Sequence, residues 1–307
     1  MTTAVVFAYH DVGARGLRVL LAHGFDVGLV VTHDDDPEET LWFERVRDVA
    51  ESRGLATIAP ADPNAAEVVA RVAACAPDFL FSFYYRRMLG DALLALPRRG
   101  ALNLHGSLLP RYRGRAPVNW AVLHGETHTG ATLHYMATKP DAGDIVGQQP
   151  VPILPDDTAR DVFAKVTVAA EIVLDAALPL LVAGTAPRRP QDLRQGSYFG
   201  GRTPEHGRID WTHDATAIHN LVRAVAPPYP GALTTIDSLP ARILATRVLD
   251  RAAPPGPPTI GVEDGRLIAH CGGGGTLALY SLEIDGAPVD PAAWLARHGT
   301  NPMALPR

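Results

Sequence analysis

Cysteine is nearly absent from this sequence of 307 residues, which contains two, Cys75 and Cys271. Two cysteines so far apart exclude a disulfide framework and a cysteine-based zinc site, and they fit a reducing compartment. The sequence also lacks a basic N-terminal flank followed by an apolar run long enough for a signal peptide. We therefore expect a cytoplasmic location.

An excess of positive charge is missing too. The formal net charge is −5, so no global positive field attracts nucleic acid or an anionic membrane. No complete P-loop or dinucleotide-binding glycine fingerprint is present, which argues against a nucleotide cofactor. His124, Glu126 and His128 in HGETH lack the spacing of the H-E-x-x-H motif. We therefore expect no metal.

The sequence contains one long apolar run, at residues 158–183, and charged residues interrupt it, among them Asp161, Lys165, Glu171 and Asp175. A membrane-spanning helix needs about 20 predominantly apolar residues with few charges. The run therefore predicts a helix with one buried face. We expect no membrane insertion.

The first two thirds of the chain alternates strand and helix patterns. Strands are expected at residues 4–9, 27–33, 78–85, 101–107, 131–137 and 143–153. Helices are expected at 16–24, ended by Gly24; at 37–54, with Trp42 and Phe43 as core residues; and after Asp156 or Asp157 as cap, bent or ended near Pro179. This order predicts an α/β fold with a Rossmann-like, doubly wound, mostly parallel sheet.

The texture changes near residue 184, where Pro, Gly and Arg become frequent. A helix is expected at 215–225, and strands at 231–236, 241–249, 266–271 and 276–284. Gly272–Gly275 fits a hairpin turn between the last two strands. Short strands at close spacing predict a small β-barrel similar to an oligonucleotide-binding fold. The expected division is a catalytic domain at 1–190, a linker at 191–204 and the barrel at 205–307.

Polar residues stand out at the end of the fourth strand, in ALNLHGS. Asn103 and His105 are two residues apart, so on a strand they share one face. Ligands of open α/β sheets bind outside the carboxyl ends of the strands. Asp141 lies in the turn after a later strand, and Gly143 permits a tight backbone path there. If the two strand ends are neighbours, the Asp141 carboxylate meets His105. An amide, an imidazole and a carboxylate suit acyl transfer to an amine.

Several segments together resemble the 10-formyltetrahydrofolate-dependent formyltransferases. They are FAYHDVG, FSFYYRRML, ALNLHGSLLPRYRGRAPVNWAVLHGETHTGATLHYMATKPDAGDIV, YFGGRTPEHGRIDW and HNLVRAVAPPYPGA. FAYHD, FSFYYR, the R-A-P-x-N-W run and FGGRTP are most similar to the branch that formylates UDP-4-amino-4-deoxy-L-arabinose for lipid A modification and polymyxin resistance. The resemblance implies a sugar-nucleotide N-formyltransferase. It resembles the formyltransferase part of a bifunctional enzyme, so we expect another protein to carry out the decarboxylation.

The resemblance also implies roles for individual residues. Asn103, His105 and Asp141 fall on the family's catalytic triad. The folate pocket falls on Arg87, Met88, Leu89, Arg115, Ala137, Thr138, Lys139 and Pro140. Relatives often carry His in place of Arg87, so a contact through its side chain stays open. Arg111, Arg113 and Arg115 are expected to help close over the substrates, or to form a solvated basic loop. Arg202, Asn220, Arg223 and Tyr229 are candidates for the sugar-nucleotide site, or for structural contacts between the domains.

Three other functions remain to be separated from this one. Methionyl-tRNA formyltransferase is similar in both domains, but its relatives carry a basic insertion where this sequence reads THDDDPEETLWFE. Phosphate binding needs Lys and Arg, so the acidic segment argues against tRNA. A different 4-amino-4-deoxy sugar nucleotide is a second alternative. A nucleic-acid-binding barrel is a third, but its expected strands lack interleaved basic and aromatic residues. A homo-oligomer is compatible with the sequence, which leaves the oligomeric state open.

Overall fold

The computed structural model describes residues 1–35 and 41–306 and divides the chain into two compact units. Each unit is assembled from three segments. The first contains Met1–Pro117, His128–Pro152 and Phe163–Gly200, and the second contains Val118–Thr127, Ile153–Val162 and Gly201–Arg307. Two short segments from within the first two thirds of the chain therefore belong to the second unit. The expected domain limits at 190 and 205 do not include this interleaving.

The first unit is built on a seven-stranded sheet with the order β3-β2-β1-β4-β5-β7-β8. The strands are β1 (Thr3–Ala8), β2 (Asp26–Val31), β3 (Thr57–Ile58), β4 (Phe79–Phe83), β5 (Gly100–His105), β7 (His128–Tyr135) and β8 (Ile145–Pro152). The strands from β3 to β5 are parallel, and β7 and β8 are antiparallel additions at one edge. The prediction of a Rossmann-like, mostly parallel sheet is confirmed.

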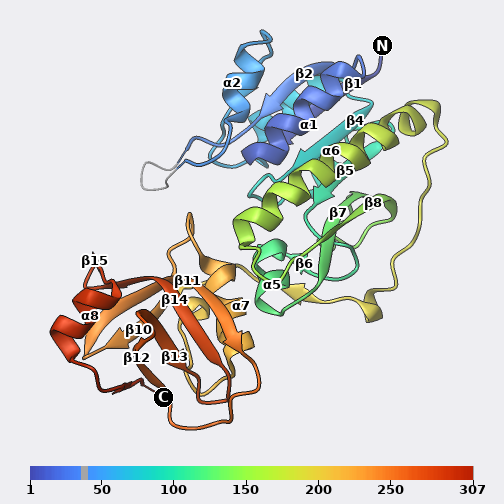
Figure 1. Cartoon of the computed structure of the whole chain (residues 1–307). Helices are drawn as coiled ribbons and strands as arrows, with labels where there is room; N and C mark the ends of the chain where they lie inside the picture. Colours follow the sequence, from blue (N-terminus) through green and yellow to red (C-terminus); the bar gives the residue numbers. More distant parts are fainter. Residues whose placement is uncertain (36–40, 307) are drawn as a thin grey trace. The chain divides into compact units, whose positions relative to one another are not determined.

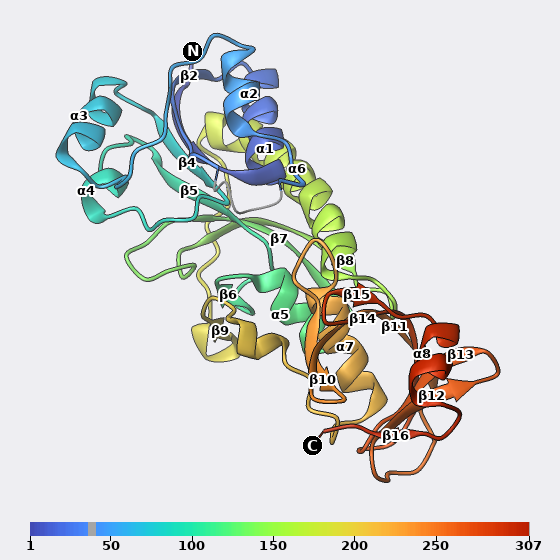
Figure 2. The ribbon, with the colours of Figure 1, turned by 90° about the vertical axis from the view of Figure 1, so that its left-hand side faces the viewer.

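Helices cover both faces of this sheet (Figure 2). They are α1 (His10–Ala22), α2 (Val46–Glu51), α3 (Ala66–Ala74), α4 (Asp91–Leu94) and α6 (Ala159–Ala183). Val5 and Phe7 of β1 pack with Val68 and Val72 of α3 in one core cluster. The alternate residues of β1, Ala4, Val6 and Ala8, are buried as well. Burial on both faces explains why the strands are continuous apolar runs instead of alternating patterns.

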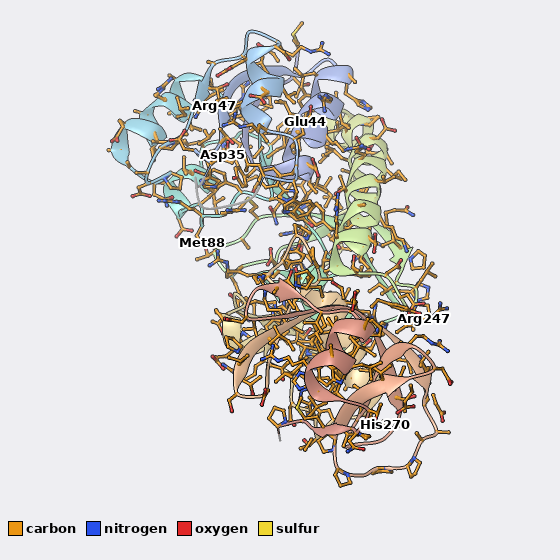
Figure 3. All side chains as sticks on the ribbon, turned by 60° about the vertical axis from the view of Figure 1, so that its left-hand side comes forward. Asp35, Glu44, Arg47, Met88, Arg247 and His270 are labelled. Carbon is orange, nitrogen blue, oxygen red and sulfur yellow. The ribbon has the colours of Figure 1, made fainter. Side chains whose placement is uncertain are left out.

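The helix expected at 37–54 is shorter in the structure. Residues 37–40 lie outside the described residues, and the helix begins at Val46. The expectation that Trp42 and Phe43 are helical core residues is wrong. Both are half-buried in non-helical chain, where the Phe43 ring stacks on His10 at 3.9 Å and Trp42 meets the same imidazole edge-on. Figure 3 labels Asp35, Glu44 and Arg47 in this region. Ring packing around His10 replaces the helical face.

The long helix α6 differs from the expectation at its start. The expected cap, Asp156 or Asp157, is wrong: Thr158 and Asp161 form a reciprocal capping pair, in which each backbone N–H donates to the other side chain. The helix runs through Pro179 to Ala183. By length and composition alone α6 could cross a membrane, but half of its most apolar window is buried inside the fold. That burial fits a core helix.

The second unit contains a curled antiparallel sheet (Figure 1). Its strands follow the order β10-β11-β14-β13-β12-β16, and β15 pairs with β14. They are β10 (Ala232–Ile236), β11 (Leu239–Asp250), β12 (Thr259–Glu263), β13 (Arg266–His270), β14 (Thr276–Ile284), β15 (Ala287–Pro288) and β16 (Met303–Ala304). Trp211 and Trp294 are fully buried in its core. The predicted barrel-like domain and the Gly272–Gly275 hairpin turn are confirmed.

Several smaller elements complete the chain. The second unit contains α7 (Ala215–Val225), which fits the expected helix, and α8 (Pro291–His298), which the sequence analysis did not predict. The remaining elements are α5 (Pro117–Leu123), β6 (Arg113–Gly114), β9 (Tyr198–Phe199), η1 (Leu193–Gln195) and η2 (Pro204–Gly207). Strand β9 pairs in parallel with β6. The expected linker thus contributes a strand that pairs with the first unit.

Candidate active site

Strands β5 and β7 carry three polar side chains of the candidate active site. Asn103 and His105 alternate with Leu104 along β5 and so leave the same face of the sheet. The antiparallel register places His134 of β7 directly opposite Asn103. Opposed residues of an antiparallel pair share a face. His134 therefore joins Asn103 and His105, although the sequence analysis did not single it out.

Asp141 is the point at which these side chains meet. Its Oδ1 lies 3.5 Å from His105 Nδ1 and 3.5 Å from His134 Nε2, and it accepts an N–H from Asn103 Nδ2 at 3.4 Å. The meeting expected between Asp141 and His105 takes place, but the expected route is wrong. Because β7 is antiparallel to β5, its carboxyl end pairs with Leu102, and the following turn returns along the strands to bring Asp141 to His105.

The backbone around Asp141 is held in place from two sides. Gln191 donates its amide N–H groups to the carbonyls of Asp141, at 3.1 Å, and Gly143, at 2.6 Å. A Cβ atom on Gly143 would lie 2.0 Å from the carbonyl oxygen of Tyr135, so this position requires glycine. Asp141 itself has a φ of 52°, an uncommon value for a residue other than glycine. Such backbone persists where surrounding contacts determine it.

The Asp141 side chain is nearly inaccessible to solvent, with 13% exposure. Burial by itself would raise its pKa, but the charge of His105, a hydrogen bond from His134 and the backbone N–H of Gly114 at 2.8 Å outweigh burial. The pKa of Asp141 is therefore held well below its usual range, and the carboxylate stays ionised at neutral pH. The site contains a fixed negative charge.

His105 faces oxygen atoms with both ring nitrogens. Nε2 donates to the carbonyl of Tyr112 at 2.7 Å, and Nδ1 faces Asp141 at 3.5 Å. An imidazole donates through both nitrogens only in its protonated form. The ring is also buried, with 6% exposure. The two oxygen atoms fix the orientation of the ring, with Nδ1 toward the Asp141 carboxylate.

Asn103 can serve the cluster and a ligand at once. Its Nδ2 lies 3.2 Å from His134 Nε2 and 3.4 Å from Asp141 Oδ1. These two atoms are 3.5 Å from each other, so they lie on the same side of the amide nitrogen. The nitrogen carries two N–H groups, and an amide N–H can donate to a substrate oxygen. His134 keeps the amide in this orientation, because its Nδ1 is fixed on the carbonyl of Tyr135 at 2.8 Å.

The loop after β5 is anchored so that its backbone reaches the cluster. Ser107 donates its hydroxyl to the carbonyl of Arg111 at 2.6 Å, and Thr132 donates its hydroxyl to the carbonyl of Ser107 at 2.6 Å. Gln148 adds a bond to the carbonyl of Leu109 at 2.9 Å. These bonds explain why the S-L-L-P-x-Y-R-G segment is ordered. It presents the Tyr112 carbonyl to His105 and the Gly114 N–H to Asp141.

The three arginines of this loop have different environments. Arg111 and Arg115 are exposed, as expected for a solvated basic loop. Arg113 is buried, with 7% exposure, so for this residue that alternative is wrong. The reason is the pairing of β6 with β9: the backbone N–H of Arg113 donates to Ser197 at 3.0 Å and that of Arg115 to Phe199 at 2.9 Å.

All the residues expected to bind folate except Arg115 come from two segments that the structure brings together. Thr138 donates its hydroxyl to Asp91 at 3.1 Å, which joins the turn after β7 to the segment after β4. Asn64 fixes the latter segment through the Met88 carbonyl at 3.0 Å and the Gly90 N–H at 2.6 Å. Among the expected residues, Leu89 is buried, Pro140 is half-buried, and Arg87, Met88, Arg115, Ala137, Thr138 and Lys139 are exposed. Figure 3 labels Met88. Their folate contacts stay predictions.

The residues expected to bind the sugar nucleotide all lie in the second unit. Asn220 accepts two hydrogen bonds from the guanidinium of Arg223, which also donates to the carbonyls of Leu154 and Asp157. Arg202 donates to the carbonyl of His206 at 2.7 Å. The backbone N–H of Tyr229 donates to Ala226. Asn220 and Arg223 thus make structural contacts within this unit, and a sugar-binding role for the four stays a prediction.

A metal centre is not among the arrangements found in residues 1–35 and 41–306. No group of three or more His, Cys, Asp and Glu side chains there could hold a metal ion. The HGETH segment is divided between the units, since His124 and Glu126 belong to the second and His128 begins β7. The chemistry that the structure supports at Asp141 is proton transfer and hydrogen bonding.

Comparison with known families agrees with this chemistry. The sequence model described as "Formyl transferase" matches residues 19–178, which contain Asn103, His105, His134 and Asp141. The model described as "Formyl transferase, C-terminal domain" matches residues 202–299. The first match alone covers more than half of the chain.

Solved structures with the same fold include three of interest. The N-formyltransferase from Helicobacter canadensis, in complex with folinic acid and dTDP-3-aminofucose, has a TM-score of 0.71 and 19% identity over 91% of this chain and 99% of that chain. A sugar N-formyltransferase from a Shewanella species has a TM-score of 0.64 and 19% identity, over 79% of this chain and 96% of that chain. Glycinamide ribonucleotide transformylase 1 from Symbiobacterium toebii has a TM-score of 0.53 and 22% identity, over 62% of this chain and 93% of that chain. At these identities the comparison establishes the fold.

Proposed function

Because the chain belongs to the formyl transferase family, we propose that it transfers the formyl group of 10-formyltetrahydrofolate to the amine of a sugar nucleotide. The observation that carries this proposal is the cluster of Asn103, His105 and Asp141. An amide donor, an imidazole and a fixed carboxylate fit an amide-type formyl donor, whose transfer needs an oxyanion partner and a proton carrier. The sugar N-formyltransferases of the same fold support an amino sugar as acceptor.

The first step forms a bond between the neutral amine of the sugar and the formyl carbon. The formyl oxygen then becomes an oxyanion in a tetrahedral intermediate. Asn103 donates an amide N–H to this oxygen, and the charge of His105 adds to the stabilisation. Donors held in place before the reaction stabilise developing charge without reorganising. The anchored loop and His134 supply that preorganisation.

The second step breaks the bond between the formyl carbon and the folate nitrogen. His105 gives its proton to the departing nitrogen and takes up the proton that the attacking amine loses, so the reaction has no net proton change. Asp141 stabilises the charged form of His105 between these transfers. The Tyr112 carbonyl orients the ring. The folate itself is proposed to lie against Arg87 to Leu89, Arg115 and Ala137 to Pro140.

The proposed acceptor is UDP-4-amino-4-deoxy-L-arabinose, formylated for lipid A modification and polymyxin resistance. Four motifs support it, because they resemble the branch of the family that uses this sugar: FAYHD at residues 7–11, FSFYYR at 81–86, the R-A-P-x-N-W run at 115–120 and FGGRTP at 199–204. A dTDP-linked amino sugar is the second candidate, favoured by the ligand of the Helicobacter canadensis structure. The acidic THDDDPEETLWFE segment argues against methionyl-tRNA.

The test is an assay with purified protein and 10-formyltetrahydrofolate. UDP-4-amino-4-deoxy-L-arabinose, a dTDP-linked amino sugar and methionyl-tRNA are offered separately, and tetrahydrofolate release and the mass of the acceptor are followed. Turnover of the UDP sugar alone supports the full proposal, and turnover of the dTDP sugar alone changes the acceptor. Turnover of tRNA alone, or of none of the three, refutes an amino sugar of this class as acceptor.

A further inference from the structure

Arg113 is a buried cation without a counter-charge in the described part of the chain. Its side chain is inaccessible apart from 7% of the residue surface. Its Nε is buried and has no hydrogen-bond partner there. The guanidinium lies over the ring of Tyr198, whose centroid is 6.0 Å away. The backbone, by contrast, is fixed by β6 and β9. The side chain is therefore held in position but not neutralised.

Arg223 in the second unit shows what a structural buried arginine looks like in this protein. It is equally buried, with 6% exposure. Its guanidinium donates to the side-chain oxygen of Asn220 and to the carbonyls of Leu154 and Asp157. Buried charges are ordinarily compensated in this way, because an unpaired one is costly to remove from water. Arg113 departs from this rule.

The position of Arg113 in the chain places it at the candidate active site. The residue before it, Tyr112, offers its carbonyl to His105, and the residue after it, Gly114, donates its N–H to Asp141. Both neighbours are thus fixed on catalytic side chains. Arg111 and Arg115, which are exposed, add positive charge to the same loop. Arg113 therefore lies between two residues whose backbones contact the candidate site.

We propose that Arg113 is an anion-binding residue, whose missing partner is an oxygen of a phosphate or carboxylate group on a bound substrate. The planar guanidinium fork matches both groups, and its bonds to them are strong because both partners are charged. The inference rests on the proposed function for the identity of the anion. That anion is either the diphosphate of the sugar nucleotide or a carboxylate of the folate.

The test compares ligand binding without turnover, by calorimetry, in the wild type and in Arg113→Met. The probes are UDP, dTDP and inorganic pyrophosphate for the phosphate, and folinic acid for the carboxylate. We expect Arg113→Met to weaken one class of probe about 10- to 100-fold. Arg111→Met removes the same charge from an exposed position of the same loop and should change affinity less than about threefold. Weaker binding of the phosphate probes alone identifies the bound anion as the diphosphate of the nucleotide. Weaker binding of folinic acid alone identifies it as a carboxylate of the folate.

Thermal unfolding of the unliganded proteins separates this role from a structural one. Removing an unpaired buried charge should leave the melting temperature unchanged or raise it. Arg223→Met should lower it, because several bonded oxygens lose their partner. Arg113→Met with wild-type affinity for every probe would overturn the proposal. So would a lowered melting temperature with binding intact.

A second substitution keeps the test decisive if Arg113→Met does not fold. Arg113→Lys retains the charge but loses the two-pronged geometry. We expect it to fold and to weaken the same class of probe roughly three- to tenfold. Wild-type affinity in this variant contradicts the proposal. Because binding is measured without formyl transfer, an inactive enzyme that still shows the Arg113 effect refutes the proposed reaction and leaves the anion site standing.

Discussion

In the first unit, His105 and His134 surround a carboxylate that is largely shielded from solvent, Asp141. In the second unit, His219 contacts a hydroxyl and a carbonyl and lies 3.5 Å from the exposed carboxylate of Asp156. The pKa of Asp141 is lowered, so this carboxylate is held ionised. At His219 burial dominates and lowers the pKa, so the neutral ring is favoured. His105 and His219 are both buried and both face a carboxylate, so what differs between the two sites is the solvent exposure of that carboxylate.

Two asparagines, one in each unit, allow a similar comparison. The amide nitrogen of Asn103, which is half-buried, lies against His134 and Asp141. Asn119 in the second unit is buried, and its amide donates to the carbonyl of Ala224 at 2.9 Å. Asn103 contacts two side chains of the candidate active site, whereas Asn119 satisfies a backbone carbonyl. These pairs give matched controls for His105 and Asn103.

The largest effect is expected from His105→Gln. Loss of the proton carrier should lower kcat about 10²- to 10⁴-fold, the usual contribution of general acid and base catalysis. His219→Gln, which alters the matched histidine of the second unit, should leave kcat unchanged. Single-turnover kinetics with the acceptor that the substrate assay identifies measures the rates of both variants. Equal rates for the two variants would remove His105 from the mechanism.

Asn103→Ala should lower kcat about 10²- to 10³-fold with a smaller change in KM, because an oxyanion donor acts mainly in the transition state. Asn119→Ala should affect stability instead of catalysis. It leaves a buried carbonyl unpaired and should cost about 1–3 kcal/mol of folding free energy without altering kcat. Steady-state kinetics and urea denaturation of both variants test the pair. A stability loss in Asn103→Ala with normal kcat contradicts the oxyanion role.

Asp141→Asn tests the electrostatics of the cluster through pH. The pKa of Asp141 is lowered in the folded state, so its stabilising contribution is present above the ordinary aspartate pKa of about 4 and is lost as pH falls below it. The difference in unfolding free energy between wild type and Asp141→Asn should therefore shrink from pH 5 downward, as measured by urea denaturation with circular dichroism. A difference that stays constant with pH argues against an ionised, stabilised carboxylate.

The smallest effect is expected at His219. Its folded pKa is lowered, so the unfolded chain takes up a proton first and stability falls as pH drops below the ordinary histidine pKa of about 6.5. At pH 8, His219→Gln should cost about 0.5–1.5 kcal/mol for a lost hydrogen bond, and this cost should diminish toward pH 5. Tryptophan fluorescence suits the experiment, since Trp120, Trp211 and Trp294 all belong to the second unit. A cost that grows on acidification would mean that the folded state stabilises the charged ring.

The sequence by itself determined the fold class and most of the strands. Continuous apolar runs such as 78–85 become doubly buried strands because both of their faces must be covered. It also determined that Asn103 and His105 share a face, since strand alternation is a local property. Gly143 was predictable for a similar reason, as its constraint arises within one turn.

Only the tertiary structure decided what these residues meet. His134 joined the site through the register between β5 and β7, and register depends on pairing between distant segments. Arg113 was buried by pairing with residues 198–199, which the sequence assigned to a linker. Trp42 and Phe43 lie outside the expected helix and pack on His10. In each case the local pattern left several arrangements open, and contacts between segments far apart in the chain selected one.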